Sequence, residues 1–285
     1  MIVVADSGST KTDWRILDGS KEVGNYYTHG FNPYIQSTEE ITALLQGELG
    51  GKIAHAMAVT EVYFYGAGCS SKKNNESVAQ AIKTIFPGAE IEVNHDLLAA
   101  ARAACGREAG VTAILGTGSN TCFYDGENIL ENVESLGFIL GDEGSGAYIG
   151  KKLLQAYFYK ELPAHVVDVF NNTYKMSKEE IFESVYKKPF PNRFLAAFSR
   201  FVKDNIAEPS VKKIVVSAFE DFFDNHVCRY AKHKEVPLNS VGSVGYHFKD
   251  VLIEVGKSKG VTVNRVLESP TPGLIEYHVG AFQRK

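Results

Sequence analysis

A plan that occurs twice along the chain constrains its fold more than any other feature. Residues 2–19 and residues 111–129 each contain an apolar run, a turn rich in Gly, Ser and Thr, a second run, and an Asp-Gly pair. An apolar run that ends in such a turn is typical of a β-strand, a tight turn and a second strand. The repetition indicates a weak internal duplication in topology and predicts an α/β chain of two related domains, whose two turns would lie across one cleft.

The remaining segments alternate between strand and helix patterns. Short apolar runs predict strands over residues 59–66 and 91–95, and apolar residues at helical spacing predict a helix over residues 76–86. A further helix is expected to follow the second of these strands, with Asp96 at the junction, and short strands or turns are expected near residues 239–248 and 261–268. From residue 144 we expect mostly helices, at residues 145–161, 177–187, 192–205, 209–233, 245–258 and 272–284.

Composition and charge argue against several classes of protein. The chain has 285 residues, a net charge of −4 and no long basic run, so we expect no nucleic-acid partner and no acidic-membrane partner. The start lacks the basic region of a signal peptide, and no stretch approaches the roughly 18 apolar residues of a membrane span. The four cysteines show no CxxC spacing. We therefore expect a reduced, cytoplasmic protein without a disulfide framework or a zinc site.

The first turn has the composition of a phosphate-binding loop. A phosphate needs several converging N–H donors, and only small residues let the backbone approach it closely. Asp6, at the end of the preceding strand, is a candidate to hold Mg²⁺ through water. Asp, Gly and Ser are also common in ordinary β-turns, so this turn alone leaves both interpretations open. The candidate phosphate contacts are Ser7, Gly8, Ser9, Thr10 and Lys11.

The second turn, with the candidate contacts Gly116, Thr117 and Gly118, has the same chemistry. Two such turns in related contexts are stronger evidence for phosphate binding than one. Neither turn has the GxxxxGK[ST] spacing of a P-loop, and the second lacks the third glycine of a dinucleotide-binding fingerprint because position 121 is Thr.

Asp96 is the candidate catalytic residue. It stands between a predicted strand and a predicted helix, where a carboxylate could take a proton from a hydroxyl that attacks phosphorus. Asp is also a preferred helix N-cap, and the two roles are compatible.

Small and polar residues gather at three further places. The segment 137–146 holds four glycines and two acids. It suits either a sugar-hydroxyl site, with Asp142 accepting hydrogen bonds, or a solvated loop, and we expect Glu143 to be solvated. The turn at Gly242 and Ser243 could let an adenine lie against the backbone, or it is an ordinary turn before a helix. Asn32, before a proline, could offer an amide side chain or serve only as a turn residue.

Taken together, these motifs resemble the actin, hexokinase and heat-shock ATPase superfamily, and within it the N-acetylglucosamine kinase and BadF/BadG-type ATPase family. The resemblance covers nearly the whole chain. Residues 6–14 resemble the family's first phosphate motif, residues 116–120 its second, and residues 242–246 its adenosine motif. The most specific stretch is 141–150, which follows the family in both its small residues and its acids.

The resemblance implies two ribonuclease H-like domains, each with a mixed five-stranded sheet flanked by helices, and ATP in the cleft between them. Residues 1–108 would form the first domain, joined by the C-terminal helix 272–285, and residues 109–271 would form the second.

The resemblance also assigns roles to individual residues. Asp96 matches the family's catalytic base, and Asn32, Asn120 and Asp142 match its sugar-contacting positions. Thr117 matches a position near sugar and phosphate. These roles imply a kinase that uses ATP and Mg²⁺ to phosphorylate the primary 6-hydroxyl of an amino sugar, with N-acetylglucosamine as the expected substrate. We also expect a homodimer.

Two rival functions remain open. Activator ATPases of the same family hold an iron–sulfur cluster with cysteines at a subunit interface, and no cysteine pair in this sequence is spaced for that role. A non-catalytic sugar or nucleotide sensor would share the binding residues, although an intact Asp96 favours catalysis.

Overall fold

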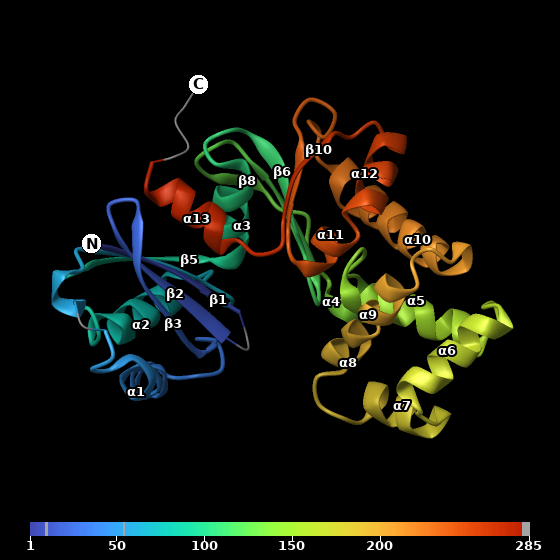
Figure 1. Ribbon diagram of the computed structural model, residues 1–285. Coiled ribbons are helices and arrows are strands. Elements are labelled where there is room, and N and C mark those ends of the chain that lie inside the picture. The colour runs from blue at the N-terminus through green and yellow to red at the C-terminus, as the bar shows by residue number, and fades with distance from the viewer. Residues whose placement is uncertain (9–10, 54, 281–285) are drawn as a thin grey trace. The chain divides into compact units, whose positions relative to one another are not determined.

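The computed structural model describes residues 1–8, 11–53 and 55–280. The chain divides into two compact units, each built on a five-stranded sheet (Figure 1). Unit 1 comprises Met1–Glu108, Gly126–Asn128 and Pro270–Lys285, and unit 2 comprises Ala109–Asp125 and Ile129–Ser269.

In unit 1 the sheet has the strand order β3-β2-β1-β4-β5. Its central strand, β1 (Ile2–Ser7), pairs antiparallel with β2 (Lys11–Asp18) and parallel with β4 (Glu61–Gly66). At the two edges, β3 (Lys21–His29) pairs antiparallel with β2, and β5 (Glu90–His95) pairs parallel with β4. The sheet is therefore mixed, as predicted from the family resemblance.

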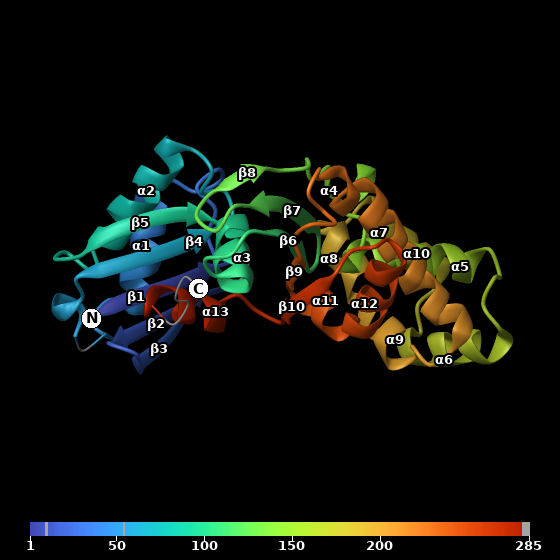
Figure 2. The same cartoon turned by 90° about the horizontal axis from the view of Figure 1, so that it is seen from above.

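Helices cover both faces of this sheet. Figures 1 and 2 show α3 (Asp96–Cys105) beside α13 (Thr271–His278) on one face, and α1 (Thr38–Leu49) and α2 (Lys72–Lys83) on the other. A short 3₁₀ helix, Ala56–Ala58, precedes β4. Because side chains alternate along a strand, β1 supplies one hydrophobic cluster with its odd-numbered residues, and α1 and α2 complete that cluster.

The sheet of unit 2 repeats this arrangement, with the strand order β10-β9-β6-β7-β8. The central strand β6 (Gly110–Leu115) pairs antiparallel with β7 (Ser119–Tyr124) and parallel with β9 (Leu238–Val241). The edge strands are β8 (Ile129–Glu131), antiparallel to β7, and β10 (Val263–Leu267), parallel to β9. Each strand thus has a counterpart of the same direction in unit 1, which confirms the predicted duplication of topology.

Most of the helices of the described chain belong to unit 2. Their bounds are α4 (Gly137–Leu140), α5 (Gly146–Phe158), α6 (Ala164–Tyr174), α7 (Lys178–Tyr186), α8 (Pro191–Ala197), α9 (Ser199–Asp204), α10 (Pro209–Asn225), the 3₁₀ helix Val227–Arg229, α11 (Ser243–His247) and α12 (Lys249–Ser258).

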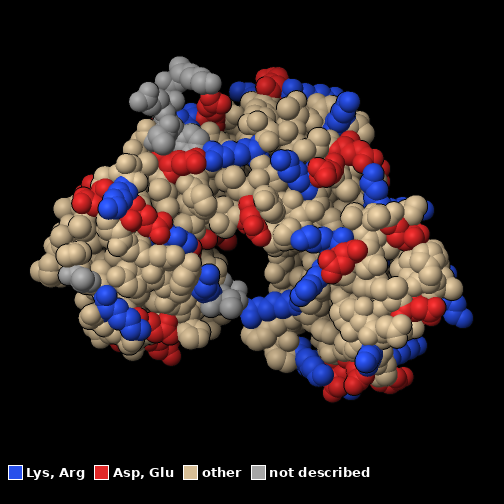
Figure 3. Space-filling model, in the orientation of Figure 1, with Lys and Arg blue, Asp and Glu red and all other residues tan. Residues whose placement is uncertain are grey.

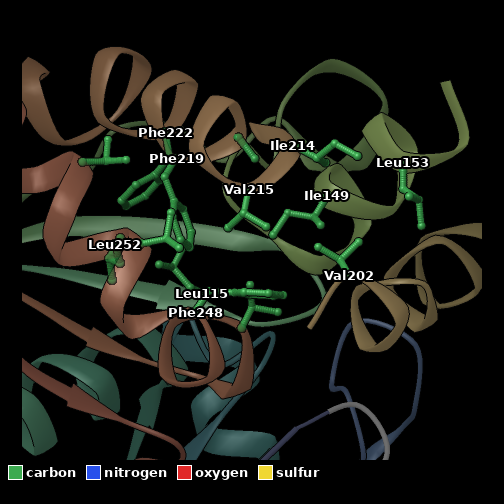
Figure 4. Packing of buried hydrophobic residues seen from close by; sticks show 14 of the residues in the cluster. Leu115, Ile149, Leu153, Val202, Ile214, Val215, Phe219, Phe222, Phe248 and Leu252 are labelled. Carbon is green, nitrogen blue, oxygen red and sulfur yellow. The ribbon is translucent and has the colours of Figure 1, made fainter. Parts of the chain in front are cut away.

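The core of unit 2 lies where α5, α10 and α12 meet β6. Figure 4 shows Leu115 from the strand among Ile149, Phe219, Phe222 and Leu252 from the helices. All five side chains are fully buried. Buried leucine, isoleucine and phenylalanine side chains stabilise a fold by about 1.5–3 kcal/mol each, so this cluster rigidly supports the turn that follows Leu115.

Three predicted helices differ from the structure. The helix expected over 192–205 is two helices, α8 and α9, which meet at the buried Phe198. The helix expected over 245–258 is likewise interrupted at Phe248. The helix expected over 209–233 ends at Asn225, because the next residue, His226, leaves helical geometry and bonds with a distant loop. Of the last predicted helix, residues 281–285 lie outside the described residues.

Three helices were not predicted, namely α1, α6 and the short helix α4. A capping box, in which Ser37 and Glu40 each bond with the other's backbone N–H, begins α1. The sequence contains this signal as Ser37 followed three residues later by Glu40. Helix α6 follows Pro163 and contributes Val166 and Phe170 to the core.

Charged residues of both signs are interspersed over the face shown in Figure 3. Within the described ranges, no helix combines the length and the apolar character that crossing a membrane would require.

Candidate active site

In unit 1 the parallel strands bring three candidate segments to one edge of the sheet. Ser7 at the end of β1 is the register partner of Gly66 at the end of β4, and Gly66 is the partner of His95 at the end of β5. Asp6 directly precedes Ser7 in the sequence, and Asp96 directly follows His95. In open α/β sheets, ligands bind outside the carboxyl ends of the strands, where these residues lie.

Asp6 carries an unusual carboxyl group. Burial raises its pKa to about 7, and the charges of Asp96 and Asp13 act in the same direction, while Lys11 partly opposes them. Asp13 is the antiparallel register partner of Asp6. The cause is physical: a carboxylate loses hydration when it is buried, and nearby negative charges make ionisation still less favourable.

Asp96 is the first residue of α3, and His95 occupies the N-cap position. Burial raises the pKa of Asp96, while the charge of His95 and the backbone N–H groups of Leu97 and Asp96 lower it in part. The buried thiol of Cys69 is close enough for the Asp96 charge to help raise the thiol's pKa to about 12, although burial is the larger cause. Asp96 is therefore the first helical residue and not the N-cap, and its catalytic role stays a prediction.

The first turn is closed by its own polar groups. The buried hydroxyl of Ser7 lies 2.7 Å from that of Thr12, and the N–H of Gly8 donates to the carbonyl of Lys11 at 3.0 Å. Ser7 and Gly8 therefore shape the turn. Ser9 and Thr10, which were predicted to contact phosphate, lie outside the described residues.

The ammonium group of Lys11 lies 4.0 Å from the centre of the Tyr27 ring on β3. A cation–π contact of this kind holds the lysine above the hairpin surface. Contact between Lys11 and phosphate stays a prediction.

Asn32 packs against the loop that follows β4. Its Oδ1 accepts the N–H of Tyr34 at 2.9 Å, and a side chain at Gly68 would collide with the same oxygen. Asn74 of α2 donates to the carbonyl of Gly68 at 2.9 Å, which holds this loop from the other side. The structure thus brings Asn32 beside the segment 66–69.

In unit 2 the second turn rests on the start of α5. The N–H groups of Gly146 and Ala147 donate to the carbonyls of Gly116 and Thr117, at 2.8 and 3.1 Å. The Thr117 side chain is exposed. The orphan N–H groups of a helix N-terminus are thus satisfied by the turn and hold it in place.

Asp142 lies directly against this turn. Its Oδ1 accepts the N–H of Ser119 at 3.3 Å and lies 3.5 Å from the hydroxyl of Ser135. A Cβ at Gly118 would approach its Oδ2 to 2.9 Å, so glycine permits the close fit. Burial raises the pKa of Asp142, and the Ser119 N–H partly offsets that effect.

Asn120 follows on β7 with its side chain partly fixed. Its Oδ1 accepts the N–H of Thr121 at 2.9 Å and the side-chain amide of Asn132 at 3.0 Å. Asn132 also donates to the backbone carbonyl of Val133. The amide group of Asn120 is therefore held in a defined orientation.

The expectation that Glu143 is solvated was wrong. Its two carboxylate oxygens lie 3.1 Å from the side-chain nitrogens of Asn225 and His226, and only 14% of its side chain is exposed. The sequence placed Glu143 in a polar loop, but the end of α10 covers that loop.

Gly242 and Ser243 connect β9 to α11. Gly242 has a φ of 126°, and a Cβ there would collide with the carbonyl of Leu115, so the two turns of unit 2 touch through their backbones. Ser243 lies on the wall of a pocket of about 400 Å³. The other lining residues are Ser199, Arg200, Lys203, Asp204, Val244, His247 and Phe248.

Within the described part of the chain, no three His, Cys, Asp or Glu side chains form a group that could hold a metal ion. A water-mediated Mg²⁺ contact at Asp6 does not require such a group and stays a prediction.

Similarity to known proteins identifies the family of the chain. The model of the BadF/BadG/BcrA/BcrD ATPase family matches residues 5–164. The chain belongs to this family. The matched range includes Asp6, Asp96, both Gly-rich turns and Asp142.

Solved structures agree with the family. A proposed N-acetylglucosamine kinase from Porphyromonas gingivalis is 43% identical, with 98% of this chain and 99% of that chain covered and a TM-score of 0.92. A second proposed N-acetylglucosamine kinase, from Chromobacterium violaceum, is 16% identical over 97% and 98% of the two chains, with a TM-score of 0.71. A glucokinase of the ROK family from Streptomyces griseus, bound to glucose and AMPPNP, is 13% identical over 97% of each chain, with a TM-score of 0.56. The last two show the fold alone. No curated protein matches the sequence.

Several residues that shape the site carry no motif in the sequence. Ser135, Asn132, Asn225 and His226 come from segments with ordinary composition, and they reach the site only through the fold. A buried carboxylate needs hydrogen-bond partners, so the burial of Glu143 would have indicated that such partners exist. The sequence alone does not show that Glu143 is buried.

Asp6→Asn tests the raised carboxyl pKa. The folded pKa of about 7 lies above the unfolded value of 3.8, so the folded state keeps a proton that the unfolded state loses. Wild-type stability should therefore fall, relative to the variant, as the pH rises from about 4 to 7, by a few kcal/mol, and the difference should then level off. Urea denaturation at several pH values measures it. Parallel pH profiles for the two proteins would contradict the assignment.

Proposed function

We propose that the protein is an ATP-dependent sugar kinase that phosphorylates the primary 6-hydroxyl of an amino sugar, with N-acetylglucosamine as the first candidate. The observation that carries the proposal is the half-buried carboxyl group of Asp96, with its raised pKa, at the edge of the sheet where the parallel strands end. The 43% identity with a proposed N-acetylglucosamine kinase supports the choice of sugar. The homodimer and the cytoplasmic location stay predictions from the sequence.

Asp96 is proposed to accept the proton of the attacking hydroxyl. An efficient general base has a pKa closer to the operating pH than an exposed aspartate has, and burial shifts Asp96 in that direction. The N–H groups at the start of α3 keep the charged form accessible, because they donate to a carboxylate at a helix N-terminus. Burial and these N–H groups therefore shift the pKa of Asp96 in opposite directions, and burial has the larger effect.

The sugar is proposed to contact Asn32, Thr117, Asn120 and Asp142. An ionised carboxylate has about four acceptor positions, and Ser119 and Ser135 use only one oxygen of Asp142. The remaining oxygen can accept hydroxyl groups of a sugar. The exposed Thr117 side chain and the oriented amide of Asn120 offer further polar contacts on the same turn and strand.

The nucleoside is proposed to occupy the pocket beside Ser243. Its volume of about 400 Å³ suits a small ligand. Arg200, Lys203 and Asp204 offer charged partners for polar atoms of the nucleoside. The two Gly-rich turns are proposed to hold the phosphates, and Asp6 to orient the water shell of Mg²⁺. When bound, ATP supplies the phosphoryl group and Mg²⁺ offsets its negative charge.

The family also suggests an activator ATPase as a second candidate. That function would need cysteines that reach a cluster at a subunit interface. Cys69, Cys105 and Cys122 are buried within their units, and only Cys228 among the four is half-buried. This observation favours the kinase over the activator.

A panel of sugars tests the proposed function. ADP release, followed with a coupled assay, should rise with N-acetylglucosamine or glucosamine and should not rise with 6-deoxy-N-acetylglucosamine, which lacks the accepting hydroxyl. If no sugar raises ADP release, or if the 6-deoxy sugar works equally well, the proposal is wrong.

Asp96→Asn should lower kcat by roughly 10²–10⁴-fold and leave the sugar KM within a few-fold, because the amide cannot accept the proton. The matched control is Asp18→Asn, which changes an exposed aspartate at a hairpin of the same unit and should keep full activity. Steady-state kinetics with sugar and ATP measure both variants. Full turnover by Asp96→Asn would rule out its role as the base.

Ser243→Phe should raise the KM for ATP by about tenfold or more, because the ring fills the proposed nucleoside pocket, while the sugar KM changes little. Tyr246→Trp is the control, since Tyr246 stands on the same short helix but does not line the pocket. Equal effects on the KM values of ATP and sugar would contradict the placement of the nucleoside.

A further inference from the structure

The side chain of Glu143, next to the candidate sugar residue Asp142, is fixed by hydrogen bonds to both of its carboxylate oxygens. Asn225 donates its side-chain N–H to Oε1, and the Nε2 of His226 lies 3.1 Å from Oε2. Because a carboxylate only accepts, the Nε2 of His226 must be the donor. The His226 side chain is only 5% exposed, so this bond is formed almost out of reach of water.

The end of α10 presses on the same segment. The His226 ring stacks on Phe222, with the ring centres 5.8 Å apart. Phe222 in turn lies where a Cβ at Gly144 would approach it to 2.9 Å, and Gly144 has a φ of 75°. The residues at the end of α10 therefore fix this segment in two ways. Asn225 and His226 bond with Glu143, and the Phe222 ring packs against Gly144.

The neighbouring residue, Asp142, adopts a backbone conformation that needs such support. Its φ is 59°, in the left-handed region that residues other than glycine rarely occupy. A strained backbone of this kind persists only where its surroundings hold it, and it is frequent at functional sites. The carbonyl of Asp142 accepts the N–H of Ser145, and its carboxylate accepts the N–H of Ser119.

In the part of the chain that the structure describes, the His226 side chain makes a single hydrogen bond, which a different side chain can replace. Its Nδ1 is buried, and no hydrogen-bond partner for it lies among the described residues. The ring therefore contributes one bond, the donation from Nε2 to Glu143. The amide nitrogen of a glutamine can reach a similar position, whereas a leucine of similar size cannot donate.

We propose that His226 and Asn225 are positioning residues for sugar binding: through Glu143 they hold the strained Asp142 in the geometry that accepts the sugar hydroxyls. This inference rests on the proposed function and assigns sugar affinity, rather than the chemical step, to the end of α10. No feature of the sequence motifs points to either residue.

Two variants of one position test the proposal. His226→Leu should raise the sugar KM by about tenfold or more while kcat and the ATP KM stay within about twofold, because only sugar binding depends on Asp142. His226→Gln should stay close to wild type. Phe170→Leu, which loosens the core of unit 2 at α6, is the control for lost stability and should leave the sugar KM unchanged.

Hydrogen exchange gives a readout that needs no sugar. The amide of Ser119 donates to Asp142, so it should exchange about tenfold faster in His226→Leu than in wild type, and at the wild-type rate in His226→Gln. Phe170→Leu should leave this amide protected. If His226→Leu does not fold, Asn225→Ala replaces it, because Asn225 is exposed and its loss removes one bond to Glu143. For Asn225→Ala a smaller change in the same direction is expected.

The outcomes separate the two proposals. Fast exchange at Ser119 in His226→Leu, together with no sugar-dependent activity in wild type, would keep the positioning of Asp142 and reject the sugar kinase. Unchanged exchange and an unchanged sugar KM in both His226→Leu and Asn225→Ala would overturn the positioning role. Equal effects of His226→Leu and His226→Gln would show that ring packing, not the bond to Glu143, holds the loop, and would also overturn it.

Discussion

Parallel pairing of the central strands is the constraint on which the candidate sites depend. In unit 1, β1, β4 and β5 run in the same direction, so the ends of all three reach one edge of the sheet. In unit 2, β6, β9 and β10 do the same. Residues that are far apart in sequence, such as Asp6 and Asp96, become neighbours at that edge. A hydrophobic cluster packs against each sheet and supports these strands.

Burial then gives these neighbours their chemistry. An aspartate on the surface would stay ionised and hydrated, but the pKa values of Asp6, Asp96 and Asp142 are all raised, with burial as the largest cause. Other groups limit each shift: the charge of Lys11 for Asp6, the charge of His95 and the N–H groups at the start of α3 for Asp96, and the N–H of Ser119 for Asp142. A carboxyl group whose pKa burial raises and directed donors partly lower thus appears in both units, as Asp96 and as Asp142, and supports two different proposed roles.

Local patterns predicted much of this arrangement because they are encoded in a few adjacent residues. The strand–turn–strand plan depends on alternating apolar residues and small turn residues, so both copies were found, and the start of α3 at Asp96 follows from the same kind of signal. The end of α10 could not be found in this way. The helix ends at Asn225, and the next residue, His226, bonds with Glu143, 83 positions earlier, a contact that no local pattern contains. For the same reason the partners of Asp142 and Asn120 were missed.

The most direct test of the account is the identity of the phosphorylated product. ³¹P NMR of the protein mixed with ATP, Mg²⁺ and N-acetylglucosamine distinguishes transfer to a sugar from hydrolysis. The account predicts that a sugar phosphate ester signal grows together with ADP as ATP is consumed. Growth of inorganic phosphate and ADP without an ester, over a panel of amino sugars, would contradict it.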